Sequence, residues 1–240
     1  MPRNIWIVIP TFNEAGNIER AVAAAQGALA LVNDADPHVL IVDDASPDGT
    51  GQIADRLAAA GPTVEVLHRT TRDGLGPAYL AGFARALEGG AELICEMDAD
   101  LSHDPADIPR LVAAIDAGAD LALGSRYVDG GAVVEWGLAR RMISRSACLY
   151  ARAVLGLPIR DLTGGYKCFR RSVLESIDLA SVRSHGYVFQ IELTLRAVRR
   201  GFRVVEVPIT FRDREHGKSK MSARIAVEAA WRVPQLRARR

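Results

Sequence analysis

Residues 4–14 read NIWIVIPTFNE, an apolar and β-branched run that changes abruptly to polar residues at its end. Such a run predicts a strand buried on both faces of a sheet. The Ala-rich segment that follows, residues 15–31, has apolar residues at helical spacing and predicts a helix. The same unit recurs: strands are expected at 39–43, 63–67, 92–97 and 120–124, and helices at 50–60, 76–87 and 105–117. This alternation predicts an α/β fold with a Rossmann-like, mostly parallel sheet and helices on both faces.

The regular alternation stops after Tyr127. A loop is expected at Gly130 and Gly131, and residues 161–169 (DLTGGYKCF) are interpreted as a glycine-containing turn. Helices are expected at 138–155, at 188–200 and from Met221 onward, with a last strand at 204–209. No repeat or low-complexity linker interrupts the chain, so the 240 residues predict a single domain.

Composition restricts the kind of partner. Hydrophobic residues make up 49% and charged residues 25%, as in ordinary globular proteins, and the net charge of +1 excludes a uniformly basic nucleic-acid binder. Residues 212–240 are locally basic, with nine Lys and Arg against three Asp and Glu. Three widely spaced cysteines without a CxxC pair favour a reducing cytosol over a disulfide framework. Neither a signal peptide nor a membrane-spanning run is predicted.

Polar residues collect where the first, second and fourth strands end. These positions are Pro10 to Glu14, Asp43 with Asp44, and Asp98 with Asp100. Carboxyl ends of parallel strands meet at one edge of a sheet, where ligands bind. Each cluster alone is explained as well by capping of the next helix, but three acidic clusters together are costly unless a cation or hydrogen-bond donors lie among them. The pattern therefore indicates a ligand site.

The spacing of Asp98 and Asp100 points both carboxylates the same way along an extended segment. Oxygen ligands of this kind suit Mg²⁺ or Mn²⁺, which keep waters and also bind substrate phosphates. No His or Cys residues occur at zinc spacing, and the lone His103 is interpreted as a loop residue. Neither GxGxxG after the first strand nor GxxxxGK[ST] anywhere is present, which speaks against a dinucleotide oxidoreductase and a P-loop ATPase.

Five segments carry a family resemblance. IVIPTFNEAGNI, IVDDASPDGT, MDADLSHDP, GSRY and GGYKCF resemble glycosyltransferase family 2, in order and spacing, from about residue 5 to residue 225. GSRYVDGG, RRMISR and FRDREHGKSKM are similar to the polyprenol-phosphate (dolichol-phosphate) mannose synthases within it. The resemblance implies a GT-A fold and a metal-dependent hexosyltransferase that moves mannose, with inversion, from GDP-mannose to a polyprenyl monophosphate.

The resemblance also implies a donor site at the three strand ends. Residues 10–14 match the loop that lines the base and ribose, and Asp100 matches the nearest metal ligand. Ser102 stands where the family often has Gln, so it is a second candidate metal ligand through its hydroxyl. The implied donor-binding residues are Pro10, Phe12, Glu14, Val42, Asp44, Asp98, Ala99 and Asp100.

The implied acceptor site is basic. Arg140 and Ser144 are four residues apart and share a helix face, and a guanidinium can grip a phosphate with two hydrogen bonds. For the neighbouring Arg141 and Arg145, a solvated basic face explains the pattern equally well. The residues that match acceptor positions are Arg126, Arg140, Ser144, Arg214, Ser219 and Lys220. Asp161, Gln190 and Glu192 match further family motifs, although each is explained equally well as structural hydrogen bonding.

A phosphate acceptor changes what catalysis requires. A phosphate monoester has its second pKa near ~6 and is largely dianionic at neutral pH, so it needs positioning rather than a strong base. We therefore assign no catalytic base, Asp161 being only a weak candidate, and expect the catalytic contributions to come from Asp100, Arg126 and Lys220.

The partners follow from this interpretation. Residues 1–125 are expected to bind the nucleotide sugar and residues 126–220 the acceptor. Residues 221–240 form a basic helix or tail that fits either a membrane surface or an ordinary C-terminal helix; a membrane-protein partner is the other route to a lipid substrate. We expect a cytoplasmic protein, peripheral at the cytoplasmic face of a membrane. The alternatives are UDP-glucose or another donor, transfer to a growing glycan, and a non-catalytic nucleotide-sugar-binding module.

Overall fold

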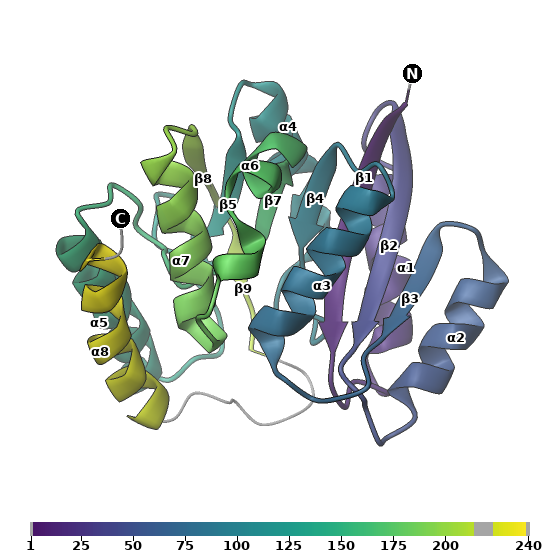
Figure 1. The fold of residues 1–240 in the computed structure, drawn as a ribbon, viewed down its shortest axis with the longest axis horizontal. Coiled ribbons are helices and arrows are strands. Elements are labelled where there is room, and N and C mark those ends of the chain that lie inside the picture. Colours follow the sequence, from purple (N-terminus) through teal and green to yellow (C-terminus); the bar gives the residue numbers. More distant parts are fainter. Residues whose placement is uncertain (1, 214–222, 239–240) are drawn as a thin grey trace.

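The computed structural model describes residues 2–213 and 223–238 and is built on one seven-stranded sheet (Figure 1). The strands lie in the order β3-β2-β1-β4-β7-β5-β8. All neighbours pair in parallel except β7, which is antiparallel to both β4 and β5. The strands are β1 (Arg3–Thr11), β2 (Ala35–Asp43), β3 (Val64–His68), β4 (Leu93–Glu96), β5 (Leu121–Ser125), β7 (Lys167–Arg170) and β8 (Val204–Pro208), with a separate parallel pair β6 (Ala132–Val133) and β9 (Thr210–Phe211).

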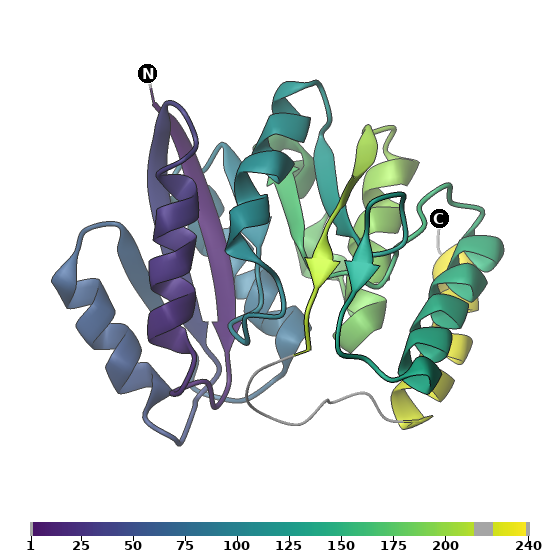
Figure 2. The ribbon, with the colours of Figure 1, turned by 180° about the vertical axis from the view of Figure 1, so that it is seen from behind.

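Helices cover both faces of the sheet. Figures 1 and 2 show α3, α6 and α7 over one face and α1 and α4 over the other, while α5 and α8 lie side by side beyond the β8 edge. The helices are α1 (Ile18–Leu29), α2 (Thr50–Ala60), α3 (Leu75–Glu88), α4 (Ile108–Asp116), α5 (Leu138–Leu155), α6 (Arg171–Ser176), α7 (Gly186–Arg199) and α8 (Ala223–Ala238), with short 3₁₀ turns at Pro105–Asp107 and Leu179–Ser181. The predicted α/β fold with a mostly parallel sheet is confirmed.

The apolar run of β1 forms the centre of the core, because alternate residues enter the two layers. Ile5, Ile7 and Ile9 pack with α1 and α4, whereas Trp6 and Val8 pack with α3 and α7. A third cluster under α5, α7 and α8 includes Val233 and Leu236, so the C-terminal helix is packed on the domain. The three cysteines are buried free thiols.

The interpretation of residues 161–169 as a turn is wrong at its end. β7 begins at Lys167 and occupies the middle of the sheet. The strand was missed because it is four residues long and begins with a lysine, a residue that rarely lies fully buried. Here Lys167 is buried beside Glu96, with their charged atoms 3.9 Å apart, and its Nζ donates to the carbonyl of Gln190. The short elements α6, β6 and β9 were not predicted either.

The close approach of α3 to the sheet depends on Gly82. A Cβ at this position would lie 2.4 Å from Cγ1 of Val8 and 3.1 Å from Cγ2 of Val42. We expect Gly82→Ala to lower the free energy of unfolding by about 1–3 kcal/mol, because the helix must move away from β1 and β2. Chemical denaturation measures the change.

Gly27 in α1 provides the matched control, since it is also a helical glycine but a Cβ there would meet no atom within 4 Å. Gly27→Ala should leave stability unchanged or raise it by up to about 1 kcal/mol through helix propensity. Equal effects of the two substitutions would contradict the packing explanation.

Candidate active site

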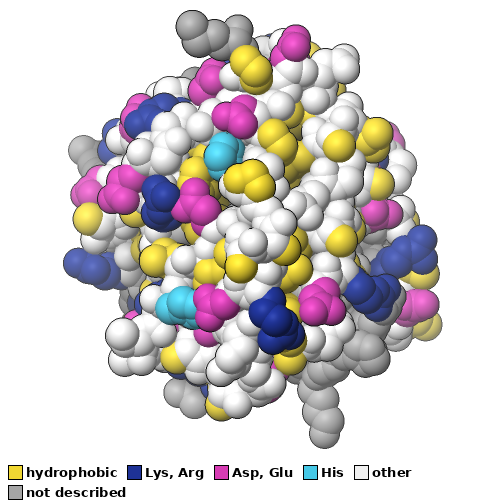
Figure 3. Space-filling view, turned by 90° about the vertical axis from the view of Figure 1, so that its right-hand side faces the viewer, with side chains coloured by type: hydrophobic (Ala, Val, Ile, Leu, Met, Phe, Trp, Pro, Cys, Tyr) yellow, Lys and Arg dark blue, Asp and Glu magenta, His cyan; other side chains and the backbone are white. Residues whose placement is uncertain are grey.

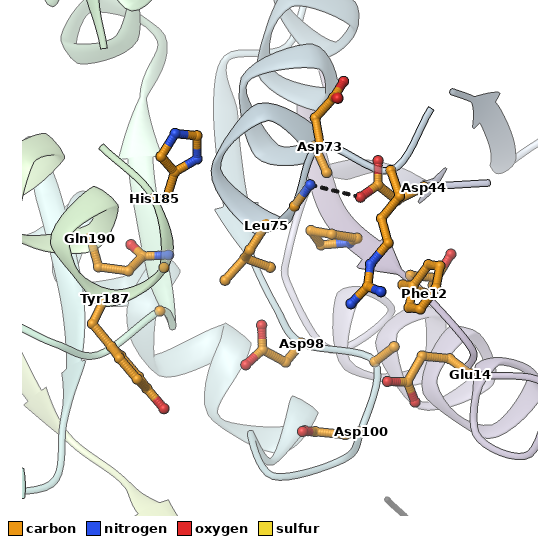
Figure 4. Close-up of a pocket in the computed structure, with 18 of the residues that line it drawn as sticks. Phe12, Glu14, Asp44, Asp73, Leu75, Asp98, Asp100, His185, Tyr187 and Gln190 are labelled. Atoms are coloured by element: carbon orange, nitrogen blue, oxygen red, sulfur yellow. Dashed lines mark hydrogen bonds between the residues drawn. The ribbon is translucent and has the colours of Figure 1, made fainter. Parts of the chain in front are cut away.

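The carboxyl ends of β1, β2 and β4 surround a cavity of about 420 Å³. Figure 4 shows Phe12, Glu14 and Asp44 on one side, His185, Tyr187 and Gln190 on the other, and Asp98 between them. Of the eight residues predicted for the donor site, seven line the cavity: Pro10, Phe12, Glu14, Asp44, Asp98, Ala99 and Asp100. Val42 does not, because its side chain is fully buried in the core beneath α3.

Polar contacts hold the loops that form the Phe12 and Asp44 side of the cavity. The Asp44 carboxylate accepts from Arg69 and, at 3.0 Å, from the Gly74 amide, the contact drawn as a dashed line in Figure 4. At the start of α2, Oδ1 of Asp48 accepts from the Thr50 amide at 3.0 Å. Its Oδ2 accepts from the Ala15 amide at 3.1 Å, which joins the first and second strand ends.

Backbone strain marks the same three loops. Asn13, Ala45 and Leu101 have φ values of 60°, 58° and 60°, in the left-handed region that non-glycine residues rarely adopt. Each follows one of the strand ends that bear the acidic clusters. Strained residues persist where the surrounding structure over-determines them, and they collect at ligand sites.

Asp98 and Asp100 are fixed by different contacts. Oδ1 of Asp98 accepts from the Tyr79 hydroxyl at 3.2 Å, and Oδ1 of Asp100 accepts from the Ser102 amide at 3.1 Å. His103 acts as a loop residue: its Nδ1 accepts from the Asp98 amide, and its ring stacks on Tyr166 at 4.7 Å. Burial lowers the pKa of His103, against the opposing effect of Asp98 and Asp100.

Two carboxylates alone make an incomplete cation site. In the described part of the chain, no group of three or more His, Cys, Asp and Glu side chains is placed to hold a metal ion. Asp98 and Asp100 nevertheless fit Mg²⁺ or Mn²⁺, since these cations take several of their ligands from water and substrate phosphates. The predicted second ligand, Ser102, has a buried hydroxyl that makes no hydrogen bond within the described part of the chain, and it lines a neighbouring cavity instead of the large one.

That neighbouring cavity, of about 60 Å³, is basic and aromatic. Its walls include Arg126, Arg140, Trp136 and Phe211. It shares Asp98, Thr163, Gly165 and Tyr187 with the large cavity, so the two adjoin. The structure thus places a cavity rich in carboxylates next to one that contains two guanidinium groups.

Arg126 is held by Asp161 in a buried ion pair. Nε and Nη2 of Arg126 each lie 2.7 Å from a carboxylate oxygen, Nη2 also donates to Thr163, and the Arg126 amide donates to Asp161 at 3.0 Å. Burial would raise the pKa of Asp161, but the charge and hydrogen bonds of Arg126 lower it below its usual range. Asp161 therefore remains an ionised carboxylate engaged with Arg126, which makes it a poor base.

The other predicted acceptor residues are placed less uniformly. Nη1 of Arg140 contacts both carboxylate oxygens of Asp213, at 3.0 and 2.9 Å, and its guanidinium lies 3.9 Å from the Trp136 ring centre. Ser144 is on the buried side of α5, where it accepts from the Tyr127 hydroxyl at 2.7 Å, and lies outside both cavity linings. Arg214, Ser219 and Lys220 lie outside the described residues.

The residues matched to secondary motifs have separate roles. Gln190 lines the large cavity, as expected for a site residue. Glu192 faces elsewhere: its Oε1 accepts from Arg196, which in turn donates to the carbonyls of Asp178 and Ser181. That arrangement fits the structural alternative. Sequence reasoning did not single out Arg72, Thr163, Tyr187, Trp136 and Phe211 as site residues. Thr163 and Phe211 lie in segments already quoted for the family resemblance and Tyr187 is in the first turn of α7, so only their position in the folded chain brings them to the cavities.

An open α/β sheet with an acidic site at its carboxyl edge agrees with a nucleotide-sugar transferase of the GT-A fold. Residues 6–178 match the model of Glycosyl transferase family 2, and the chain belongs to this family. It is 52% identical to the Polyprenol monophosphomannose synthase of Mycolicibacterium smegmatis over 95% of this chain and 85% of that protein. It is 50% identical to the Undecaprenyl-phosphate mannosyltransferase of Micrococcus luteus, over 95% and 92%.

The fold is also similar to that of a solved mannosyltransferase. PcManGT of Pyrobaculum calidifontis, in complex with GDP-Man and Mn²⁺, superposes with a TM-score of 0.62 at 18% identity, over 93% of this chain and 60% of that one. At this identity the likeness concerns the fold alone.

The Arg126–Asp161 pair allows a stability test. Asp161→Asn should lower the free energy of unfolding by about 3–5 kcal/mol, because it leaves a buried guanidinium without its counter-charge. Since the pKa of Asp161 is lowered on folding, its stabilising contribution is present above the unfolded pKa of ~3.9 and is lost as pH falls through the folded value. The stability difference should therefore be constant near neutrality and shrink in acid.

Asp129→Asn is the control, because Asp129 pairs with Arg160 at 3.4 Å on the surface. We expect no measurable change in stability there, since water screens an exposed pair. A comparable loss of stability in both variants, measured by chemical denaturation across pH, would contradict a special role for the buried pair.

Proposed function

We propose that the protein transfers mannose from GDP-mannose to a polyprenyl monophosphate, giving polyprenyl-phosphate mannose. The observation that carries the proposal is the adjacency of the two cavities, the larger acidic and the smaller basic, with Asp98 and Thr163 in both linings. The sequence is about half identical to those of a named polyprenol monophosphomannose synthase and an undecaprenyl-phosphate mannosyltransferase. This similarity supports the choice of substrates.

The large cavity suits the donor. Its volume of about 420 Å³ is in the range of small-molecule sites. The Arg72 guanidinium stacks over the Phe12 ring, 3.7 Å from its centre, and this flat pair offers a surface on which a base can stack; Asp44 follows β2 beside it. A nucleoside diphosphate would be repelled by Asp98 and Asp100, and this requires a divalent cation between them.

Asp98, Asp100 and the donor diphosphate would hold that cation, Mg²⁺ or Mn²⁺, with Ser102 as a further candidate ligand. When bound, it neutralises the charge that develops on the departing diphosphate. Mn²⁺ in the similarly folded PcManGT complex supports the choice of metal.

The small cavity suits the acceptor phosphate. A dianionic phosphate oxygen is already a nucleophile, so the chain needs to position it and shield part of its charge. Arg126 and Arg140 supply this, and Lys220 and Arg214 are proposed to join them. The phosphate oxygen forms a bond to the anomeric carbon while the bond from that carbon to the GDP oxygen breaks, with inversion and without proton abstraction. An ionised Asp161, occupied by Arg126, agrees with a reaction that uses no base.

The decisive assay combines the protein with polyprenyl phosphate in detergent, Mg²⁺ and radiolabelled GDP-mannose, UDP-glucose or UDP-N-acetylglucosamine. We expect a lipid-soluble product from GDP-mannose only, and none after addition of EDTA. Product from a uridine donor would support the proposed type of reaction but would contradict GDP-mannose as the donor. Absence of product from every donor would refute the proposed reaction for this chain.

Within the same assay, Asp100→Asn tests the metal assignment while preserving side-chain volume. We expect turnover to fall by about 100-fold or more, since a carboxylate that holds the cation is lost. Asp104→Asn is the control: Asp104 is exposed, caps the 3₁₀ turn at Pro105–Asp107 and lines neither cavity. Wild-type turnover of Asp100→Asn would remove Asp100 from the site.

The lipid must reach the site from a membrane, and we propose that the outer face of α5 meets it. In the part of the chain that the structure describes, no helix has the length and hydrophobicity needed to cross a bilayer. Leu138, Met142 and Leu149 share one face of α5 and are 79%, 69% and 64% exposed. The opposite side of the same helix carries Ser144 and packs on the domain.

Charge supports a lipid surface as the partner of this face. The arginines at positions 141, 145 and 152 are exposed along the border of the apolar stripe, an arrangement that suits anionic headgroups beside acyl chains. Trp231 of the adjacent α8 is exposed as well. Around α2 and β3, at the other end of the molecule, acidic and basic side chains are interspersed (Figure 3).

Replacing Leu138, Met142 and Leu149 together by Ser should weaken binding to vesicles that contain an anionic lipid by at least about tenfold, because apolar area is no longer buried. Flotation measures the bound fraction. Leu31→Ser, at an equally exposed leucine beyond α1, should bind like wild type. Unchanged binding of the triple variant would assign membrane contact to another surface.

A further inference from the structure

Trp136 lies close to both arginines of the small cavity. It follows β6 and precedes α5, and only 8% of its surface is exposed. The Arg140 guanidinium lies 3.9 Å and the Arg126 guanidinium 5.7 Å from its ring centre, and Phe211 packs edge-on at 5.3 Å. These contacts fix the plane of the indole.

The polar atom of this ring has no partner. The indole Nε1 is buried and makes no hydrogen bond to any described residue. An indole N–H can only donate, and leaving a buried donor unsatisfied costs about 1–3 kcal/mol. Folded proteins rarely leave such groups unpaired, so a ligand or a water molecule that accepts a hydrogen bond is expected here.

Two other unpaired groups line the same cavity. Nε of Arg140 and the hydroxyl of Ser102 are buried and likewise without hydrogen-bond partners among the described residues. The cavity, of about 60 Å³, thus brings together three unsatisfied groups able to donate. An oxyanion with several acceptor oxygens satisfies all of them at once, whereas a single neutral acceptor does not.

We propose that the Trp136 indole N–H donates a hydrogen bond to an oxygen of the acceptor phosphate, which makes Trp136 a substrate-positioning residue of the small cavity. The inference rests on the proposed function for the identity of the phosphate compound. Its physical basis is independent of that function: an orphan donor, held by packing, in a cavity with two guanidinium groups. The N–H fixes one oxygen while the arginines balance the charge, so the headgroup is oriented as well as bound.

The first test uses Trp136→Phe, which keeps an aromatic ring for Arg140 and Phe211 and removes only the N–H and the larger ring. We expect KM for the polyprenyl phosphate to rise about tenfold, as for loss of a hydrogen bond to a charged group, while KM for GDP-mannose stays unchanged. Trp6→Phe is the control, since the Trp6 indole donates to Asn4 away from both cavities. An unchanged acceptor KM in Trp136→Phe would overturn the inference.

The second test needs no turnover, and the titrations use the wild-type protein. The chain has three tryptophans, so ¹⁵N labelling gives three indole N–H signals, assignable with Trp6→Phe and Trp231→Phe. Wild-type protein is titrated separately with inorganic phosphate, a short water-soluble prenyl phosphate and the corresponding uncharged prenol. We expect the Trp136 proton signal to move downfield with both phosphates and not with the prenol, while the other two stay in place.

The outcomes separate this inference from the proposed function. A downfield shift with phosphate in a protein that makes no lipid product would retain the anion-binding role of Trp136 and refute the reaction. If the chemical shift of the Trp136 indole proton does not change with either phosphate, the inference is overturned even in an active enzyme. The N–H would then bond only to water. Movement with the prenol alone would overturn it too, because the cavity would then bind the chain and not its headgroup.

Discussion

The bidentate ion pair between Arg126 and Asp161 determines where the small cavity can form. Arg126 follows β5, Asp161 precedes the Gly164–Gly165 turn into β7, and the Asp161 amide donates to Glu206 of β8. Glu206 also accepts from Ser125, so one hydrogen-bond network joins the end of β5, the segment before β7 and the middle of β8. In a low-dielectric interior, each charge requires its partner, and this requirement holds Arg126 at the wall of the cavity.

The site is divided by charge in a way that suits the two anionic substrates that we propose. Carboxylates dominate the strand ends of the first half, where a diphosphate can be accommodated only together with a cation. Guanidinium groups dominate the second cavity, where a phosphate needs no metal. Asp98 and Thr163 line both cavities, and in the proposed function the reacting ends of the two substrates would meet at this border. Separate sources of positive charge for the two substrates would offset the repulsion between their phosphate groups.

Much of the architecture was predictable from local pattern. The apolar run at 4–10, the helix after it and their repetition define a parallel sheet, because strand-helix alternation packs in few other ways. Polar residues after strands one, two and four were correctly expected at one edge. Strand β7 was not predicted, since its first residue is a lysine whose burial depends on Glu96 from another strand. Trp136 and Phe211 were missed for the same reason: their surroundings come from residues far away in the chain.

The fold class, the family and the acidic strand ends can all be read from the sequence, because each of these depends on short-range periodicity and on the order of motifs. The folded chain was needed to establish that Asp161 orients Arg126 and that Glu192 holds Arg196. It was also needed to place Val42 in the core and Trp136 close to both arginines. These assignments depend on which side chains meet across the sheet and the loops. These tertiary contacts are determined by packing and by the need to pair buried charges and hydrogen-bonding groups. Neither can be inferred from the residue type at a single position.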